Sequence, residues 1–179
     1  FTVDSLSGLF FYGPKGAWLK KFYLKLPGSI LQRQLANTYP SIDAVAANPA
    51  LLGLHADIDG STIAVKDILM VAPFLKAYPA ITNFGSSVVK LKAKLEGKVG
   101  DLNIPTLAIS GLGNTSLKAS GHLTGLPDPN KTYMDLVLSE LQTTGGDILK
   151  MMPADVMPEG YQLPASLNAN GTFKGTMDR

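Results

Sequence analysis

The sequence contains no cysteine, which excludes a disulfide framework, a thiolate metal site and a cysteine nucleophile. Charged residues make up only 17% of the chain, and the net charge of +2, without a long basic block, does not indicate nucleic-acid binding. No run approaches the roughly 18 consecutive apolar residues that predict a membrane-spanning helix. A nucleophile elbow, a P-loop and a dinucleotide-binding fingerprint are also missing, so the sequence disfavours an enzyme.

The composition that remains is that of a turn-rich chain with a sizeable core. The 179 residues suit one domain, and 45% of them are hydrophobic. Glycine, with 18 residues, and proline, with 12, are both frequent, which favours many short elements over long helices. We therefore treat residues 1–179 as one unit, and interpret it as a segment cut from a larger protein.

A nine-residue alternation of apolar or small residues occurs four times and ends each time in glycine, at 52–60, 89–97, 117–125 and 167–175. Alternate residues of a β-strand point to the same face, so each copy predicts a strand with a dry and a wet face. The wet positions are largely polar in the last three copies, for example Lys90, Lys92 and Lys94 in the second. The fold class predicted is mostly β, with amphipathic strands in a largely antiparallel sheet.

Weaker alternation predicts further strands at 18–26, 62–68, 102–110 and 133–141. Short helices are expected at four places. Ser29 and Gln32 resemble a capping box ahead of Ile30 and Leu31, and Ser41 is a candidate cap for a helix that reaches Ala47. These two define a short helical insertion at residues 28–50. Residues 71–78 and 148–152 are the other two candidate helices.

His55, Asp57 and Asp59 alternate on one strand and could in principle ligate a metal ion. Successive residues on one face lie about 7 Å apart, so three in a row do not converge on a single ion without a bend. The pattern therefore favours a solvated face that matches the lysine row of the second repeat. His122 lies on the polar face of the third repeat without a recognisable nucleophile, and we predict no catalytic residue, metal or cofactor.

The dry faces allow two interpretations. They could pack against a second sheet or against the short helices as an ordinary core, which the alternation by itself favours. They could instead line an open trough for acyl chains, because both arrangements produce the same period of two.

A family resemblance bears on this choice. The stretch 104–121, followed by 123–126 and by Asp128 and Pro129, resembles AsmA-like proteins, particularly the TamB-like (translocation and assembly module) type of Bacteroidetes. Residues 27–30, 39–43 and 63–67 fit the same resemblance, which covers the chain from about Trp18 onward. The matching motifs are degenerate alternating strands.

The resemblance implies a long β-trough with an apolar interior, in a periplasmic protein anchored in the inner membrane. The implied function is non-enzymatic: to hold or conduct phospholipid acyl chains between membranes in support of outer-membrane assembly. The expected partners are phospholipid acyl chains and an outer-membrane assembly protein, but not nucleic acid. The groove residues expected from the dry faces are Leu52, Leu54, Ile58, Val89, Leu91, Leu95, Leu117, Leu123, Leu136, Leu138, Leu167 and Phe173.

The alternative is a structural or interaction scaffold for outer-membrane protein assembly, in which the dry faces form a closed β core. The segment lacks the anchoring helix and end domain of a complete family member, so the resemblance leaves open which stage of transport it serves.

Overall fold

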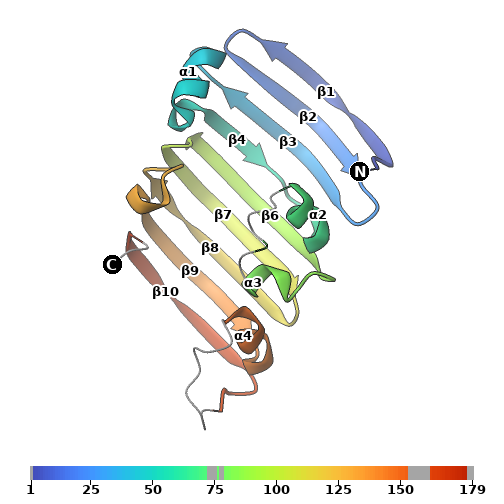
Figure 1. Ribbon diagram of the computed structural model, residues 1–179, viewed down its shortest axis with the longest axis vertical. Coiled ribbons are helices and arrows are strands. Elements are labelled where there is room, and N and C mark those ends of the chain that lie inside the picture. The colour runs from blue at the N-terminus through green and yellow to red at the C-terminus, as the bar shows by residue number, and fades with distance from the viewer. Residues whose placement is uncertain (1, 72–75, 77–78, 153–161, 177–179) are drawn as a thin grey trace.

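The computed structural model describes residues 2–71, 76, 79–152 and 162–176, and it folds them around one antiparallel sheet of ten strands (Figure 1). The sheet order is β1-β2-β3-β4-β6-β7-β8-β9-β10, and β5 pairs with β3 and β6. The strands are β1 (Ser5–Gly13), β2 (Gly16–Lys25), β3 (Ile30–Thr38), β4 (Gly53–Asp57), β5 (Ser61–Ala64), β6 (Val88–Lys98), β7 (Asp101–Leu112), β8 (Thr115–Thr124), β9 (Tyr133–Thr143) and β10 (Leu167–Thr176).

The topology is a meander in which one strand position is divided. β4 and β5 both lie between β3 and β6: β4 pairs with residues 94–98 of β6, and β5 pairs with residues 88–91. Gly60, at φ +74°, lies in the break between them, in a conformation that favours glycine. Every other strand pairs with its neighbours along the chain, so β1 and β10 form the two edges of the sheet.

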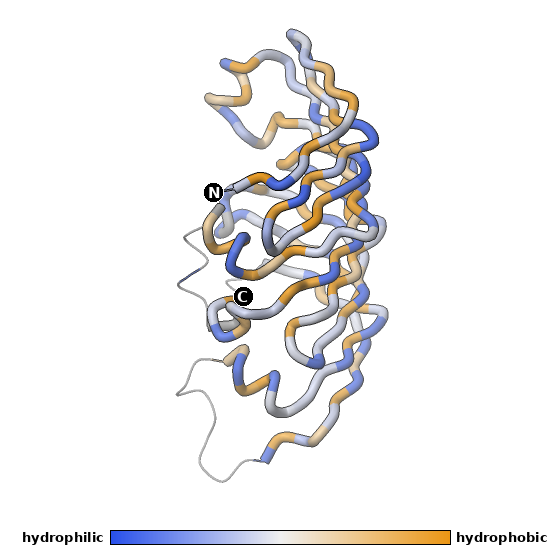
Figure 2. The backbone as a smooth tube through the Cα atoms, turned by 90° about the vertical axis from the view of Figure 1, so that its right-hand side faces the viewer, coloured by the Kyte–Doolittle hydropathy of each residue, from blue (hydrophilic) through white to orange (hydrophobic). Residues whose placement is uncertain are grey.

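In the described residues, four short α-helices lie in the connections between strands: α1 (Ile42–Ala47), α2 (Val65–Val71), α3 (Pro79–Thr82) and α4 (Gly145–Met151). Figures 1 and 2 show α2, α3 and α4 on one side of the sheet. Beneath them Val65, Phe84 and Val89 form a small buried cluster, which Leu69 and Met151 help to enclose. The closed core of the described residues is thus concentrated at the end of the sheet where β6 begins.

Two buried aspartates, one in α2 and one in α4, connect these helices to turns of the sheet through hydrogen bonds. In α2, Asp67 accepts a hydrogen bond of 2.5 Å from the Ser29 hydroxyl, which in turn accepts one from the Ala64 N–H. In α4, Asp147 accepts hydrogen bonds from the Asn114 N–H at 2.7 Å and from the Thr144 hydroxyl at 2.9 Å. Both carboxylates lie between a helix and a tight turn, so they fix where the helices sit.

The prediction of a mostly-β, antiparallel sheet is confirmed, and all four repeats contain strands: β4, β6, β8 and β10. The first is shorter than predicted, because residues 58–60 lie in the break before β5. The predicted strands at 18–26, 102–110 and 133–141 correspond to β2, β7 and β9. The helix predicted at 148–152 overlaps α4, and α1 begins after Ser41, whose side chain accepts from the Ala44 N–H.

Two local predictions are wrong. The helix predicted after Ser29 is the strand β3, because the Ser29 hydroxyl binds Asp67 and Ala64 instead of capping a helix. The insertion at 28–50 is therefore a strand, helix α1 and a 3-10 turn (Pro49–Leu51). The strand predicted at 62–68 ends at Ala64, where α2 begins. The helix predicted at 71–78 lies largely outside the described residues.

Candidate functional site: the apolar face of the sheet

The strand register separates the sheet into an apolar and a polar face. Residues that lie directly opposite each other on neighbouring strands project from the same side. Figure 2 shows the alternation of apolar and polar residues along the strands. The apolar face consists of Leu54, Ala56, Leu91, Ala93, Leu95, Leu102, Leu107, Ile109, Leu117, Ala119, Leu123, Met134, Leu136, Leu138, Leu141 and Phe173.

The apolar side chains form rows that cross the strands. One row contains Leu91, Ile109, Leu117 and Leu141, from β6 to β9. A second contains Leu102, Leu123 and Met134, and a third joins Leu136 to Phe173 on β10. The register thus places most of the predicted groove residues on one continuous surface.

Most bulky side chains of this surface remain partly accessible. Leu54, Leu91, Leu95, Leu117 and Leu123 are half-buried, and so are Leu136 and Leu138. The apolar-face side chains that are fully buried are two alanines, Ala56 and Ala93, together with Val89 and Leu102. A second layer packed over the whole face would bury the leucines as well. In the described part of the chain, α2, α3 and α4 cover the end where β6 begins, and Leu102 is the buried leucine near the opposite end.

Four predicted groove residues occupy different surroundings. Val89 belongs to the small core beside Val65 and Phe84, so it is packing rather than open surface. Leu52 precedes β4 and is half-buried, and Ile58 follows β4, where its N–H donates to the Ala93 carbonyl. Leu167 lies at the start of the edge strand β10 and is exposed, as is Phe173 further along it.

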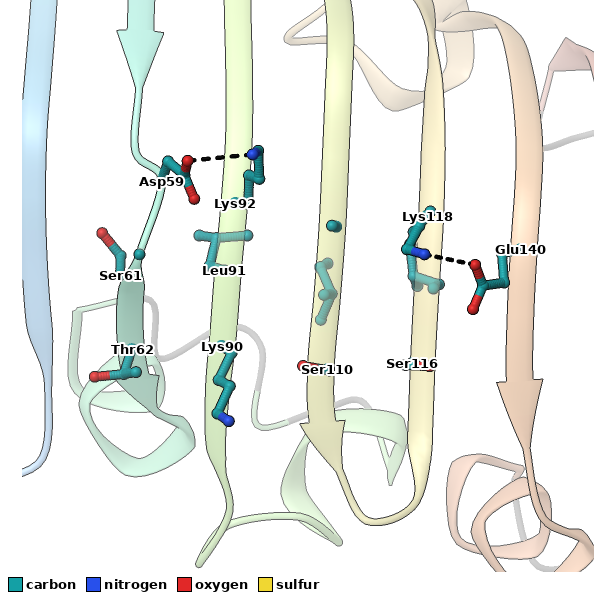
Figure 3. Close-up of a pocket in the computed structure, with 14 residues that line it drawn as sticks. Asp59, Ser61, Thr62, Lys90, Leu91, Lys92, Ser110, Ser116, Lys118 and Glu140 are labelled. Carbon is teal, nitrogen blue, oxygen red and sulfur yellow. Dashed lines mark hydrogen bonds and ion pairs between the residues drawn. The ribbon is translucent and has the colours of Figure 1, made fainter.

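Ion pairs connect neighbouring strands on the polar face. Figure 3 shows Lys92 beside Asp59 at 3.2 Å and Lys118 beside Glu140 at 2.6 Å. Arg33 also contacts Asp59, at 3.3 Å. The hydrogen bond from Lys92, aided by the charges of Lys92 and Arg33, lowers the pKa of Asp59 below its usual value. Asp59, Lys92, Lys118 and Glu140 line a shallow, solvent-open depression of about 470 Å³, where the two lysines pair with the two carboxylates.

The metal candidates lie on this polar face as predicted, with Asp57 opposite Lys94 and His55 opposite Glu96. Asp57 Oδ2 lies 3.8 Å from Lys94 Nζ, whereas Asp57 Oδ1 is buried without a hydrogen-bond partner among the described residues. Within the described ranges, no three His, Cys, Asp or Glu side chains are grouped as a metal site.

His122 is the other histidine of the chain, and its Nε2 hydrogen bonds to Asp101 at 2.5 Å. Both side chains are exposed on the polar face, where His122 lies opposite Asn103 of β7 and Asp135 of β9. The exposed pair has no water-excluding pocket around it, so its geometry is that of a surface contact.

Sequence reasoning missed an aromatic cluster at the other end of the sheet. Phe11 of β1 and Trp18 of β2 stack with ring centres 5.7 Å apart on the polar face. The sequence of β1 could have indicated this cluster, because Leu6 and Phe10 alternate there with Leu9 and Phe11. Both faces of this edge strand are therefore apolar.

The described residues define the class of the protein as a single-layer antiparallel sheet whose apolar face they cover only in part. The chain matches no protein-family model, no curated protein and no solved structure. None of the helices in the described part of the chain has the length and apolar character needed to cross a bilayer.

Proposed function

We propose that the apolar face holds or conducts phospholipid acyl chains. The observation that carries this proposal is the partial exposure of leucines that form continuous rows across the strands, without a second layer over them in the described residues. In a closed β core, the same side chains would be fully buried.

The chemistry of the face suits hydrocarbon. Its rows consist of leucine, isoleucine and methionine with interspersed alanine and glycine, and the charged side chains of these strands lie on the opposite face. Each methylene removed from water stabilises a bound chain by about 0.8 kcal/mol. A surface without fixed polar pockets gives similar energies at successive positions, which permits an acyl chain to slide.

The resemblance to AsmA-like proteins supports a cellular setting for this activity. In that setting the chain is a segment of a periplasmic protein, with its parent anchored in the inner membrane. The sheet forms part of a trough through which phospholipid passes between membranes during outer-membrane assembly. The face itself acts by sheltering hydrocarbon and catalyses no reaction.

Single-cysteine variants carrying a photocrosslinker test the proposal, since the chain has no cysteine of its own. Leu95, Leu123 and Phe173 lie on the apolar face, and each has a neighbour that points to the polar face: Lys94, Thr124 and Lys174. We expect phospholipid to be crosslinked at the three apolar positions and not at the three polar ones. Equal labelling at both sets, or labelling at neither, would refute lipid binding by this face.

Leu123→Asp tests passage of lipid rather than contact. An unpaired carboxylate in the path of hydrocarbon is costly, so transport should stop. Thr124→Asp is the matched control, because it introduces the same charge on the polar face. Circular dichroism and thermal melting establish whether each variant folds. Normal transport by a folded Leu123→Asp variant would contradict the proposal.

The second candidate is a scaffold for outer-membrane protein assembly, and the small closed core beneath α2, α3 and α4 favours it. The two candidates differ in bound lipid. Chromatography of lipid extracted from the purified protein should find phospholipid for the first and none for the second.

A further inference from the structure

The charges of the chain are distributed unevenly along the sequence. Residues 5–42 contain five basic residues and no acidic one, whereas the whole chain has 16 basic and 14 acidic residues. This segment comprises β1, β2 and β3. The basic residues are Lys15, Lys20, Lys21, Lys25 and Arg33. One edge of the sheet is therefore net positive, with Asp4, whose N–H donates to the Lys25 carbonyl, as the acidic residue beside it, although the molecule as a whole is nearly neutral.

The four lysines of this edge are exposed and carry no ion pair in the described structure, whereas Arg33 contacts Asp59. On the other strands, Lys92, Lys118 and Lys174 each have an acidic partner. The positive charge of β2 and its hairpin thus remains available for an anionic partner.

The same edge exposes large apolar and aromatic side chains. Six aromatic residues lie on β1 and β2, of the seven Phe, six Tyr and one Trp in the chain. On β1, Phe10 is 70% exposed, Tyr12 59% and Phe11 48%, and Leu6 and Leu9 are exposed beside them. Exposed apolar residues of this size on an edge strand indicate contact with an apolar partner.

Aromatic and basic groups meet at the β1–β2 hairpin. The Trp18 ring stacks on Phe11, and Lys20 Nζ lies 4.8 Å from the centre of a Trp18 ring. A depression of about 500 Å³ beside them is lined by Pro14 and Ala36, among other residues. Tryptophan and tyrosine prefer the depth of lipid headgroups, where lysine can reach phosphates.

We propose that the β1–β2 hairpin is a docking surface for an anionic phospholipid bilayer. Its lysines contact headgroup phosphates, while Phe10, Phe11 and Trp18 enter the region between headgroups and acyl chains. The apolar residues on both faces of β1 favour a lipid surface over a nucleic acid, which offers no hydrocarbon. The hairpin is separate from the rows on β6–β10, so docking does not depend on the proposed function.

Trp18 is the only tryptophan of the chain and therefore reports directly on this site. The full chain is titrated with vesicles of phosphatidylcholine containing phosphatidylglycerol, and separately with vesicles of phosphatidylcholine alone. We expect a saturable blue shift of the emission with the anionic vesicles, reversed by added salt, and little change with the neutral ones. Brominated acyl chains should quench the bound emission.

Cosedimentation with the same vesicles compares two variants of equal charge. The test variant replaces Lys15, Lys21 and Lys25 with Gln, and leaves Lys20 beside Trp18. The control replaces three exposed lysines without an ion pair elsewhere, Lys66→Gln, Lys90→Gln and Lys98→Gln. Because each lysine near an anionic surface contributes about fivefold, we expect about 100-fold weaker partitioning for the test variant. The control should lose less than fivefold.

Three results would overturn the proposal: absence of a blue shift with anionic vesicles, equal losses in the two variants, or binding to heparin or single-stranded RNA as tight as to vesicles. None of these results tests the acyl-chain proposal, which depends on lipid crosslinking at Leu123. If the protein binds anionic vesicles but no lipid is crosslinked at Leu123, the acyl-chain proposal is wrong and the docking proposal for the β1–β2 hairpin still holds.

Discussion

Among the polar side chains, we expect Asp147 to contribute most to the stability of the covered end of the apolar face. It is 3% exposed, and its carboxylate accepts hydrogen bonds from the Asn114 N–H and the Thr144 hydroxyl. Hydrogen bonds to a charged group contribute about 1.5–3 kcal/mol each. Since Asp147→Ala removes two acceptor contacts and the link between α4 and the β7–β8 turn, we expect the free energy of unfolding to fall by about 3 kcal/mol.

The same residue predicts a pH dependence of stability. Burial opposes ionisation of Asp147, but the Asn114 N–H, the Thr144 hydroxyl and the Lys150 charge outweigh it and lower the pKa of Asp147 below its usual value. A carboxyl whose pKa is lower in the folded state stabilises the fold above its unfolded pKa of about 3.9. This contribution is lost as the pH falls through the folded pKa. Asp147→Asn should remove this part of the acid sensitivity.

Urea unfolding followed by circular dichroism at several pH values measures both effects. Asp135→Ala is the control, because Asp135 pairs with Lys174 on the exposed polar face, and its loss should change stability little. An Asp147→Ala variant as stable as the wild type would refute the anchoring role. So would a loss at Asp135 that equals the loss at Asp147.

Three further predictions concern the edge, the polar face and metal binding. The open edge of β1 should make the protein associate at high concentration in solution scattering, and Phe10→Lys should suppress this; a strictly monomeric wild type would count against edge pairing. A double-mutant cycle on Lys118 and Glu140 should give a coupling below about 1 kcal/mol, because the pair is exposed, and a larger value would show that this face is shielded from solvent. Elemental analysis should find no stoichiometric zinc or calcium; metal that is lost on Asp57→Ala would reverse this prediction.

The parts of the fold that could be predicted are those that local alternation determines. In β6 and β8 every second residue is apolar or small over nine positions, and only a strand places such residues on one face. The incorrect prediction of a helix after Ser29 shows the limit of such local patterns. A serine three residues before a glutamine resembles a helix cap, but its hydroxyl binds Asp67, 38 residues away.

The candidate site was predictable to a similar extent. Alternation identified the face that carries Leu91 and Leu123, but it could not distinguish Val89, which lies under Phe84, from its open neighbours. That distinction depends on where α2 and α4 fold back. Asp147 was missed for the same reason, because its partner Asn114 lies 33 residues earlier in the chain.

The meander has a consequence for how the protein can evolve. Because strands that follow one another in the chain pair with one another, duplication of a two-residue-turn hairpin adds two strands without rethreading the others. Neighbouring strands are about 4.8 Å apart, so the nine positions extend over roughly 38 Å, and each added hairpin lengthens the sheet by about 10 Å. Selection can therefore set the span of such a sheet by copy number, much as the number of repeats sets the reach of a solenoid.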